Sequence, residues 1–497
     1  TSCMVATAAL SCSPPRTASG IHPAQLYALK VCGADKVLNL GGVQGIAAMA
    51  FGLFGCPKAD ILCGPGNNGG DGFEAAYQLQ QRGKRVVVTY FGTQQELPAD
   101  AAISLERCQQ AGVQFADVPP VATDLCIDAM LGLGSSRAPE GMMANWLQHM
   151  ESLPAAILSV DLPTGLNADT GVRLTAVGAD ESKRHGPVKR RFTLSLLTLK
   201  PGLFTHQGRD TAGEVWWDDL GSGSYREAVA PDAWLPLPPE PTPRPHASHK
   251  GTFGDVLIVG GAPGMGGAAV LAADAALHAG AGRVYVNLLD SHGPGWDAMR
   301  PAIMFRRLED LDPGALTVVC GCGGSKGVKS LLPRIMEAAP HLVLDADALN
   351  WVARDQDLQM LLRQRRMHAG NSATVVTPHP LEAARLLRLE TSDIQKDRLG
   401  AAHALTERFG CTVVLKGSGT IVCTPGEVPC INPTGNGRLA TAGTGDVLAG
   451  QLGALLARGF NAHQAAVIAV WRHGHAADCW TADSALTADA LARRLAP

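Results

Sequence analysis

A carboxylate stands at the expected start of a helix in the C-terminal half. Asp446 ends the motif TAGTGD at 441–446, and a helix-compatible segment follows at 447–459. The first amides of a helix have no partner within it and favour an anion, so a phosphate would lie beside Asp446. A carboxylate there can take a proton from a substrate hydroxyl. The pattern therefore indicates phosphoryl transfer, and the alternative is an N-capping aspartate without a catalytic role.

A second polar turn lies upstream of this motif. The run VVLKGSGTIVC at 413–423 predicts two strands joined by a tight turn. Glycines let backbone amides approach a phosphate closely. We therefore expect Lys416 to Thr420 to surround the phosphates of an adenine nucleotide.

The N-terminal half has its own dense glycine motif, PGNNGGDG at 65–72, between a short apolar run and a helix-like segment at 73–83. It lacks the lysine of a P-loop and the spacing of a dinucleotide fingerprint. Asp128 and Asp161 end two further strand-like runs, and Thr164 follows closely. Ligands of open parallel sheets bind beyond the carboxyl ends of the strands, so these side chains should converge on one phosphate-bearing ligand.

The elements that position these motifs are short β-branched or apolar runs alternating with longer helix-compatible segments. This alternation is typical of parallel α/β folds. The expected strands are 59–63, 84–91, 125–130, 155–161 and 192–199, then 255–261, 283–290, 316–321, 341–347, 373–378 and 412–416. We predict two doubly wound, three-layer α/β domains at 1–230 and 249–497, with a proline-rich linker at 231–248.

Composition excludes several classes of protein. The 497 residues exceed one module, and 42 Lys and Arg against 45 Asp and Glu leave no basic surplus for nucleic acid. No apolar run reaches the ~18 residues of a membrane span. The 13 cysteines are scattered, which argues against a disulfide framework and a structural zinc site. Cys320 and Cys322 are expected to be core residues, and we expect a cytoplasmic homo-oligomer.

PGNNGGDG, the D-A-x-x-G-x-G run from Asp128 and VDLPTGLNADTG at 160–171 resemble, in this order, the YjeF N-terminal domain over about 20–225. The resemblance implies a Rossmann-like fold and NAD(P)HX epimerase activity. It implies potassium ligands at Asn68, Asp128 and Thr164. It implies substrate contacts at Asn67, Asn68, Gly69, Gly70, Asp71, Gly132, Leu133, Gly134, Ser135, Ser136, Arg137, Ala138 and Asp161.

One position departs from that family pattern. Arg191 stands where the family has an aspartate, the expected proton-transfer base, before the LKPGL run at 199–203. Arginine stays protonated in proteins and cannot act as a base. The sequence therefore predicts hydrate binding with weak epimerisation, unless Asp180 or Glu181 substitutes as the base.

Five runs of the second half, from HKGTFGDVLIVGGAPGMGG through VLDADALN, TPHPLE and LKGSGT to TAGTGDVLAG, resemble the ribokinase-like ADP-dependent NAD(P)H-hydrate dehydratase domain over about 246–494. The resemblance implies ADP contacts at Lys416, Gly417, Ser418, Gly419, Thr420 and Gly445. It implies hydrate contacts at Gly323, His379 and Asp446. Mg²⁺ would accompany ADP. Leu381 and the GCGG run at 321–324 depart from the pattern.

Together these features predict repair of hydrated NADH and NADPH by epimerisation and ADP-dependent dehydration. The alternative is a kinase of a small alcohol joined to a non-catalytic nucleotide-binding module. Weaker matches are a dinucleotide-like GMGGAA at 264–269 and a nucleophile-elbow-like GGSKG at 323–327. The histidine pairs at 246 and 249 and at 473 and 475 are expected to face solvent.

Overall fold

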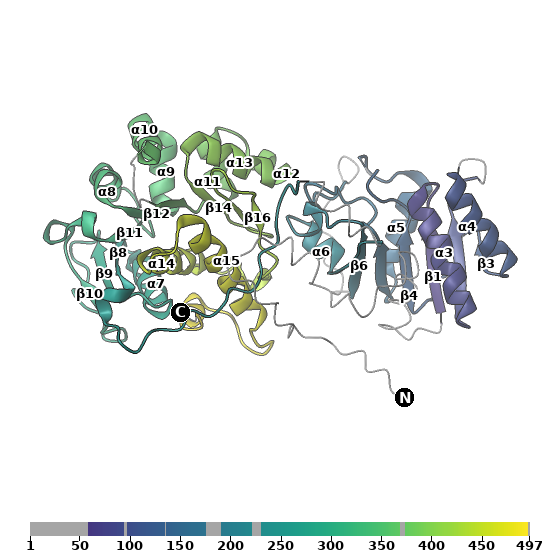
Figure 1. Ribbon diagram of the computed structural model, residues 1–497, viewed down its shortest axis with the longest axis horizontal. Coiled ribbons are helices and arrows are strands. Elements are labelled where there is room, and N and C mark those ends of the chain that lie inside the picture. The colour runs from purple at the N-terminus through teal and green to yellow at the C-terminus, as the bar shows by residue number, and fades with distance from the viewer. Residues whose placement is uncertain are drawn as a thin grey trace. The chain divides into compact units, whose positions relative to one another are not determined.

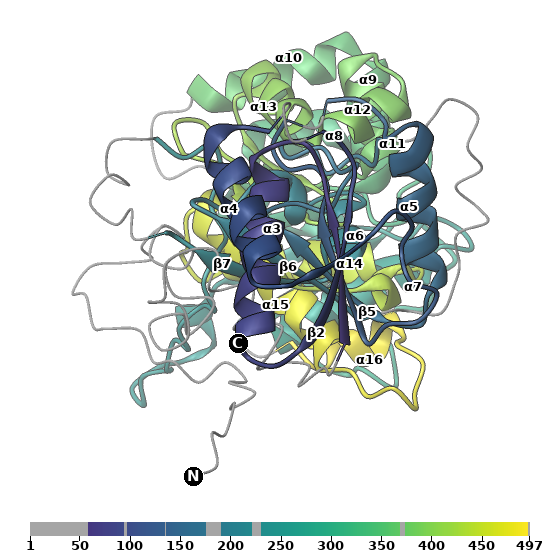
Figure 2. The same ribbon diagram turned by 90° about the vertical axis from the view of Figure 1, so that its right-hand side faces the viewer.

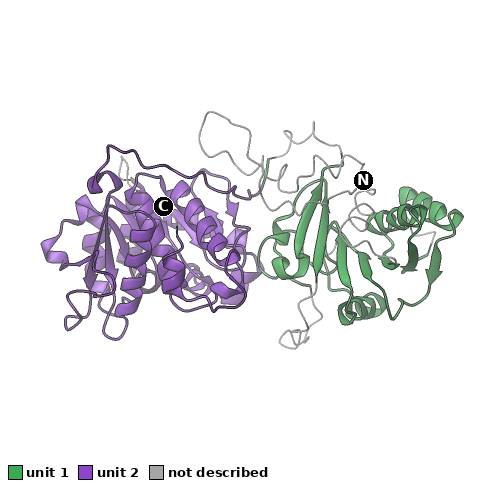
Figure 3. Cartoon of the chain, turned by 90° about the horizontal axis from the view of Figure 1, so that it is seen from below, with its two compact units in different colours: residues 1–231 green, residues 232–497 purple. Residues whose placement is uncertain are grey.

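The computed structural model describes residues 58–93, 97–134, 136–174, 190–220, 230–367 and 373–495. The chain divides into two compact units, Thr1–Pro231 and Asp232–Pro497 (Figure 3). Each unit contains its own sheet, so each is described by itself.

Unit 1 is built on a seven-stranded parallel sheet in the order β3-β2-β1-β4-β5-β6-β7. Its elements are β1 (Lys58–Cys63), α3 (Asn67–Gln81), β2 (Arg85–Tyr90), α4 (Ala99–Gln110), β3 (Gln114–Ala116), β4 (Leu125–Ala129), α5 (Gly141–Ser152), β5 (Ala156–Val160), β6 (Arg191–Leu196), α6 (Gly208–Ala212) and β7 (Glu214–Asp218). The strand order reverses between β1 and β4, the place where ligands enter such sheets.

Helices cover both faces of this sheet (Figure 2). Phe73 of α3 and Leu105 of α4 pack with Ile61 on one face, while Trp146 of α5 packs with Leu62 on the other. Neighbouring residues of β1 are buried on opposite faces because side chains alternate along a strand. The predicted three-layer arrangement is confirmed.

Helix α3 begins earlier than the sequence predicts. It starts at Asn67 rather than near residue 73, so most of the glycine motif lies in its first two turns. A Cβ at Gly69 would stand 1.9 Å from the carbonyl oxygen of Gly64, and one at Gly72 would stand 2.6 Å from Ala129 Cβ. Without side chains at these two glycines, the helix can start close to the sheet. The glycines thus serve helix packing, whereas the sequence predicts that they form a turn before the helix.

Unit 2 has a nine-stranded sheet in the order β10-β9-β8-β11-β12-β13-β14-β15-β16, parallel up to β14 and antiparallel beyond it. Its elements are β8 (Asp255–Gly260), α7 (Gly266–His278), β9 (Arg283–Leu288), β10 (Ile303–Phe305), β11 (Thr317–Cys320), α8 (Leu332–Ala338), β12 (His341–Leu344), α9 (Ala346–Arg354), α10 (Gln356–Gln364), β13 (Ala373–Val376), α11 (Pro380–Leu387), α12 (Thr391–Lys396), α13 (Arg398–Phe409), β14 (Thr412–Leu415), β15 (Ile421–Cys423), β16 (Cys430–Ile431), α14 (Thr444–Ala457), α15 (Ala462–Asp478) and α16 (Ala488–Ala492). Its strand order reverses between β8 and β11.

The sheet of unit 2 is also the middle of three layers. Helices α7, α14 and α15 lie on one side and α8 to α13 on the other (Figure 1). Leu452 of α14 and Ala272 of α7 pack with Val256 and Val319 of the strands. The fold prediction is therefore confirmed for both units.

The proline-rich segment predicted as a linker contacts unit 2. Trp234 forms an isolated parallel bridge with Cys430, and its amide donates to the Pro429 carbonyl at 2.7 Å. The Arg244 guanidinium lies over the Phe253 ring. The segment therefore extends unit 2 along its surface, and the contact boundary falls after Pro231.

In the described part of the chain, no helix is both long and apolar enough to span a membrane. All nine cysteines there are free thiols, and Cys320 and Cys322 are buried as expected.

Candidate active sites

The first candidate site lies where the order of the unit 1 sheet reverses. Asn68, on the first turn of α3 after β1, is buried together with Gly69 and Gly70. A Cβ built at Gly132, after β4, would lie 3.5 Å from both Asn68 Oδ1 and Asp161 Oδ2. The structure therefore brings the first strand end, the 132 loop and Asp161 together, as the sequence predicts.

Asn68 has an unused donor in this cradle. Its Nδ2 is buried and has no hydrogen-bond partner within the described chain. A buried amide nitrogen without a partner costs free energy, so a bound group is expected to accept from it. This donor is therefore available to a group bound in the cradle.

Asp128 and Thr164 form a tight pair beside the cradle. The Thr164 hydroxyl donates to Asp128 Oδ1 at 2.6 Å, and the Thr164 amide donates to Oδ2 at 2.8 Å. The Leu131 amide in turn donates to the Thr164 hydroxyl at 3.1 Å. Burial raises the pKa of Asp128, and the two bonds from Thr164 partly oppose this.

Lys200 is a site residue that the sequence analysis missed. Its ammonium donates to Asp161 Oδ1 and, at 2.7 Å, to the Leu196 carbonyl. Burial lowers the pKa of Lys200, while the Asp161 carboxylate opposes that change. Asp161 also has a left-handed backbone, with φ 64°, that turns its side chain off the end of β5. Lys200 could have been predicted from the sequence, because it is the lysine of the LKPGL run and this run follows the end of a strand.

Asp71 adds an acid to the same region. Burial, together with the negative charge of Asp161, raises the pKa of Asp71 from 3.8 to about 7. A carboxyl group with such a pKa can exchange a proton near neutral pH.

The remaining predicted contacts are less enclosed. Asn67 is exposed, as are Leu133, Gly134, Ser136 and Arg137, while Ala138 is half-buried. Ser135, Asp180 and Glu181 lie outside the described residues. The described residues after β4 therefore lead from the half-buried Gly132 to exposed positions.

Arg191 lies at the other end of its strand. It is the first residue of β6, pairs in register with Ile157, and sits 3.6 Å from a Glu151 carboxylate oxygen. Leu196 lies five positions further along the strand, a span of about 16 Å. The backbone of residue 191 is therefore remote from the carboxyl ends of the strands, where Asp161 and Lys200 meet.

The second candidate site lies at the reversal point of unit 2, between β8 and β11. Asp446 is on the first turn of α14, which begins at Thr444 rather than at 447. A Cβ at Gly445 would lie 3.5 Å from the Lys416 ammonium, so this cation stands at the helix start. Gly323 has φ 58°, and a Cβ there would lie 2.9 Å from Met265 Cβ.

Asp345 holds Lys416 in place and was also missed. The Lys416 ammonium donates to Asp345 Oδ1 at 2.6 Å, and the Thr377 hydroxyl donates to the same oxygen at 2.7 Å. Burial lowers the pKa of Lys416, but Asp345 and Glu382 outweigh it and the net direction is upward. Lys416 is therefore a fixed positive charge.

The base candidate Asp446 shares a cluster with Asp345 and Cys322. A carboxylate oxygen of Asp446, a carboxylate oxygen of Asp345 and the sulfur of Cys322 all lie within 4.8 Å of one another. Burial, followed by the Asp345 charge, raises the pKa of Asp446 from 3.8 to about 7. A general base is most effective when its pKa lies near the working pH.

A buried arginine supports the turn at 416–420. Arg398 of α13 is 1% exposed, and its guanidinium donates to the carbonyls of Leu415 at 3.3 Å and Lys416 at 3.2 Å. It also donates to the Gly419 carbonyl at 3.5 Å. Gly417 and Ser418 are exposed at the tip, Gly419 is buried, and Thr420 donates to the Gly417 carbonyl at 3.1 Å. The turn predicted at 416–420 is therefore present and held from below.

His379 caps α11 beside this loop. Its Nδ1 accepts from the Leu381 amide at 3.1 Å, and its own amide donates to Glu382 at 2.8 Å. Burial, with the nearby Lys416 charge, lowers the pKa of His379. Its Nε2 lies 3.3 Å from a Glu382 carboxylate oxygen, so both ring nitrogens of His379 have polar neighbours within α11.

The predicted exposure of the later histidine pair is wrong at His473. This side chain is buried in α15, and its Nε2 lies 2.9 Å from the Thr444 carbonyl, beneath the start of α14. An amphipathic helix buries one of its faces, which the HGH spacing does not reveal.

Within the GGSKG run, the Ser325 amide donates to Asp347 at 2.7 Å and its carbonyl accepts from Trp351, anchoring a turn to α9.

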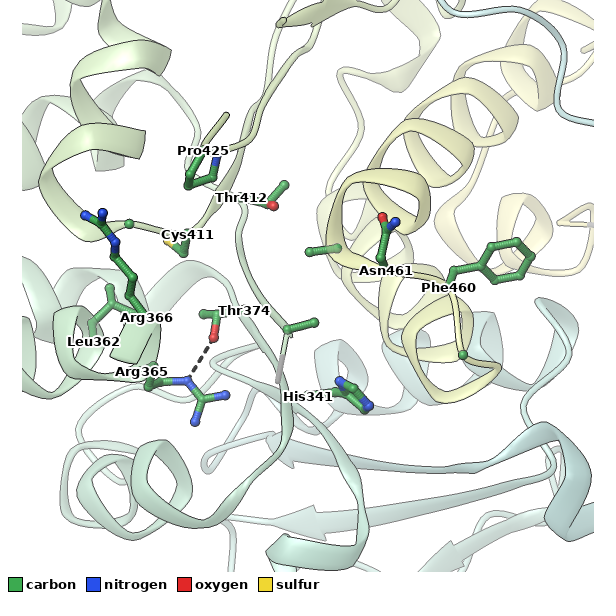
Figure 4. A pocket seen from close by; sticks show the side chains of 14 residues that line it. His341, Leu362, Arg365, Arg366, Thr374, Cys411, Thr412, Pro425, Phe460 and Asn461 are labelled. Carbon is green, nitrogen blue, oxygen red and sulfur yellow. Dashed lines mark hydrogen bonds between the residues drawn. The ribbon is translucent and has the colours of Figure 1, made fainter. Parts of the chain in front are cut away.

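A cavity of about 370 Å³ lies at the opposite edge of the same sheet (Figure 4). Its lining includes His341, Ala373 and Thr412, the first residues of β12, β13 and β14. The residues around Asp446 follow the carboxyl ends of the strands. This cavity is therefore separate from the candidate site.

Two of three matches to known families follow the same division of the chain. Residues 256–496 match the family profile of NAD(P)H-hydrate dehydratase, 44–202 that of the YjeF-related protein N-terminus, and 4–69 that of histidinol dehydrogenase. The chain is 35% identical over 438 residues to the bifunctional NAD(P)H-hydrate repair enzyme Nnr of Escherichia coli K12, covering 84% of this chain and 80% of that protein. The Coxiella burnetii protein of the same name is 34% identical over 435 residues, with 84% of each covered. A Bacillus subtilis ADP/ATP-dependent NAD(P)H-hydrate dehydratase, co-crystallised with ATP and Mg²⁺, is 28% identical, covering 51% of this chain and 91% of that one at a TM-score of 0.43.

Proposed function

This chain belongs to the family of bifunctional NAD(P)H-hydrate repair enzymes, and from that membership we propose that its two units act on hydrated NADH and NADPH. Unit 1 would interconvert the R and S hydrates. Unit 2 would dehydrate the S hydrate with ADP, giving NAD(P)H, AMP and phosphate. The observation that carries the second activity is a carboxylate with a pKa near 7 at a helix start beside a fixed ammonium.

The dehydration needs a better leaving group than hydroxide. Asp446 would take the proton of the substrate hydroxyl, and the freed oxygen would attack the terminal phosphorus of ADP. The bond from that phosphorus to the bridging oxygen breaks, and AMP departs. The ring nitrogen then expels phosphate from the neighbouring carbon, and loss of a proton from the adjacent carbon restores the double bond of the ring.

Residues of this chain supply the charges that the transfer requires. The Lys416 ammonium and the first amides of α14 face the place of the transferred phosphate, where negative charge develops. The exposed tip of the 416–420 turn would hold the adenylate phosphates, and His379 with Gly323 would contact the hydrate. The Asp345 and Asp446 carboxylates offer oxygen ligands of the kind that Mg²⁺ prefers, and the ion would neutralise phosphate charge when bound with ADP.

The dehydratase proposal is tested by Asp446→Asn. Loss of a general base typically lowers the rate by ~10²- to 10⁴-fold. We expect that loss in regeneration of reduced-nicotinamide absorbance from the S hydrate, with ADP binding by calorimetry nearly unchanged. Full turnover by the variant would remove Asp446 as the base, and a stable phosphomonoester product would favour the small-alcohol kinase instead.

For unit 1 we propose that the hydrate binds in the cradle of Asn68, Gly132 and Asp161. The unused Asn68 Nδ2 donor supports a bound ligand there. Asp128 and Thr164 present only oxygen atoms close together, which suits potassium, with Asn68 as the third ligand. The ion would offset pyrophosphate charge.

The rate of epimerisation by unit 1 can be tested directly. The sequence predicts slow processing of the R hydrate because Arg191 replaces the expected aspartate. The backbone of Arg191 lies at the far end of β6 from the cradle, so we propose that an acid of the cradle transfers the proton instead. The test supplies pure R or pure S hydrate to the full chain with ADP and compares NAD(P)H formation. Conversion of the R form well above its spontaneous epimerisation would assign the proton transfer to an acid at the cradle, and Asp71→Asn and Asp161→Asn would then identify which.

A further inference from the structure

The cavity at the amino ends of β12, β13 and β14 has no part in the proposed repair reactions. Its volume of about 370 Å³ falls within the range of small-molecule sites, about 300–1,000 Å³ (Figure 4). None of the described residues that line it is acidic, whereas three of them, His341, Arg365 and Arg366, can carry a positive charge. The lining therefore suits an anion.

Arg365 brings a buried positive charge to this cavity. The residue is 7% exposed. Its Nε donates to the Thr374 hydroxyl at 2.8 Å, and its two terminal nitrogens donate to the carbonyls of Met336 and, at 3.4 Å, Pro340. These partners are all neutral. Burial lowers the pKa of Arg365 to about 10, and no carboxylate of the described chain is among the groups that oppose this change. Buried charges in proteins are normally paired, so an anion in the cavity would supply the missing partner.

Unused hydrogen-bonding atoms accompany this charge. A guanidinium has five N–H groups, and the three bonds of Arg365 leave two of them for a ligand. His341, the first residue of β12, has a buried Nδ1 without a hydrogen-bond partner in the described chain. Burial and then the Arg365 charge lower the pKa of His341. An anion bound to both residues would offset that charge and accept from the imidazole.

Arg366 adds a second guanidinium at the same cavity. The residue is exposed, and a Cβ built at Gly410 would stand 2.5 Å from its Cδ, so its side chain lies against the glycine that ends α13. Cys411 does not offset these charges, because burial raises the pKa of its thiol to about 12. Ala462, the first residue of α15, also lines the cavity, and the start of a helix adds partial positive charge. Positive charge therefore reaches the cavity from several elements.

We propose that this cavity is a second ligand site of unit 2, which takes a small phosphorylated metabolite whose phosphate is bound by Arg365, Arg366 and His341. Two guanidinium groups favour a doubly charged phosphate over a singly charged carboxylate, and guanidinium donors match phosphate oxygens in pairs. The cavity opens at the amino ends of the strands, whereas Asp446 lies beyond their carboxyl ends. The site is therefore independent of the proposed repair activities.

The binding test is calorimetric titration of the full chain with inorganic phosphate. Saturating ADP is present throughout, so that it competes with phosphate at the 416–420 turn. A hydrogen bond to a charged group corresponds to about tenfold or more in affinity. We therefore expect Arg366→Met to weaken phosphate binding about tenfold or more. Arg365→Lys, which keeps the buried charge but loses the paired donors of the guanidinium, should have a similar effect.

Arg363→Met is the matched control. Arg363 is an exposed arginine of α10, its Nε donates to the Gln359 carbonyl at 3.2 Å, and it does not line the cavity. Its replacement removes the same charge and should leave phosphate affinity unchanged. Wild-type affinity in Arg366→Met, an equal loss in Arg363→Met, or acetate binding as tightly as phosphate would overturn the proposal.

The second measurement locates the anion in the unaltered protein, so it holds even if a variant of the buried Arg365 fails to fold. Tungstate is a tetrahedral dianion like phosphate, and its heavy atom scatters anomalously. A crystal of the full chain soaked in sodium tungstate should show anomalous density within hydrogen-bond distance of the Arg365 guanidinium. Density that is absent from the cavity, or that occurs only at the 416–420 turn, would overturn the proposal. Tungstate in the cavity of a chain that does not dehydrate hydrates would support the second site and refute the proposed function alone.

Discussion

Replacing Asp446 by Asn should stabilise the folded protein while it removes activity. Burial and the Asp345 charge raise the pKa of Asp446 from 3.8 to about 7, so the folded state resists ionisation. Below about pH 4 the carboxyl is protonated in both states and contributes no difference. As the pH rises from 4 to 7 the unfolded chain releases the proton and the folded chain keeps it, so wild type loses stability. The full cost is present above pH 7.

The size of this cost follows from the same values. A rise of the pKa from 3.8 to about 7 corresponds to an upper limit of about 4 kcal/mol above pH 7. The asparagine amide must also be desolvated, so we expect a gain of about 2 kcal/mol. For a domain of this size that gain is a rise in Tm of roughly 4–8 °C.

The assay is thermal unfolding of the full chain without nucleotide at pH 4 and at pH 8. The difference between Asp446→Asn and wild type should be near zero at pH 4 and reach its full value at pH 8. Asp393→Asn, which removes an exposed carboxylate of α12, controls for the change in net charge. If the stability difference between Asp446→Asn and wild type were the same at both pH values, or if the variant were the less stable protein at pH 8, the reasoning that burial disfavours the ionised carboxylate would be refuted.

Three further changes test the contacts around the sites. Lys416→Met leaves the buried Asp345 carboxylate without its cation, so it should lower the free energy of unfolding by about 3–5 kcal/mol in urea and abolish ADP binding by calorimetry, and a wild-type urea midpoint would contradict the ion pair. Thr164→Val removes the hydroxyl donor to Asp128, so it should lower the free energy of unfolding by about 1–3 kcal/mol and abolish any extra stability in K⁺ compared with Na⁺. Thr164→Ser should keep both the stability and its dependence on K⁺. Arg398→Met removes the donors beneath the 416–420 turn, so ADP affinity should fall more than hydrate affinity, and equal losses would argue against a role specific to that turn.

The sequence predicted the strands that carry the sites because each of them is a run of β-branched or apolar residues followed by a polar turn. It did not predict β3 and β10, which are three residues long and too short to establish a period. β7 was missed as well. It lies at the edge of its sheet, and its two end residues, Glu214 and Asp218, leave only a short apolar run between them. Edge strands tolerate charge, so their sequences resemble loops.

The same difference applies to the sites. Asp161, Thr164 and Asp446 could be found because they follow strand ends or open a helix. Asp345 follows the end of β12 in the same way, so the rule that identified Asp161 was sufficient to find it. Arg398 belongs to no motif, and only the packing of α13 against the turn after β14 brings it beneath the nucleotide loop.

The glycines of α3 also bear on how this protein's relatives are interpreted. Gly69 and Gly72 are required by backbone and strand atoms that would overlap a side chain, whatever the unit binds. Natural selection would thus preserve these letters in a descendant that had lost its enzymatic role. Asn68 is buried as well, but its side-chain amide nitrogen donates to no group within the described chain, so the fold draws no hydrogen bond from it. In a newly sequenced relative, an intact glycine pattern with Asn68 replaced would point to a retained fold and a lost ligand.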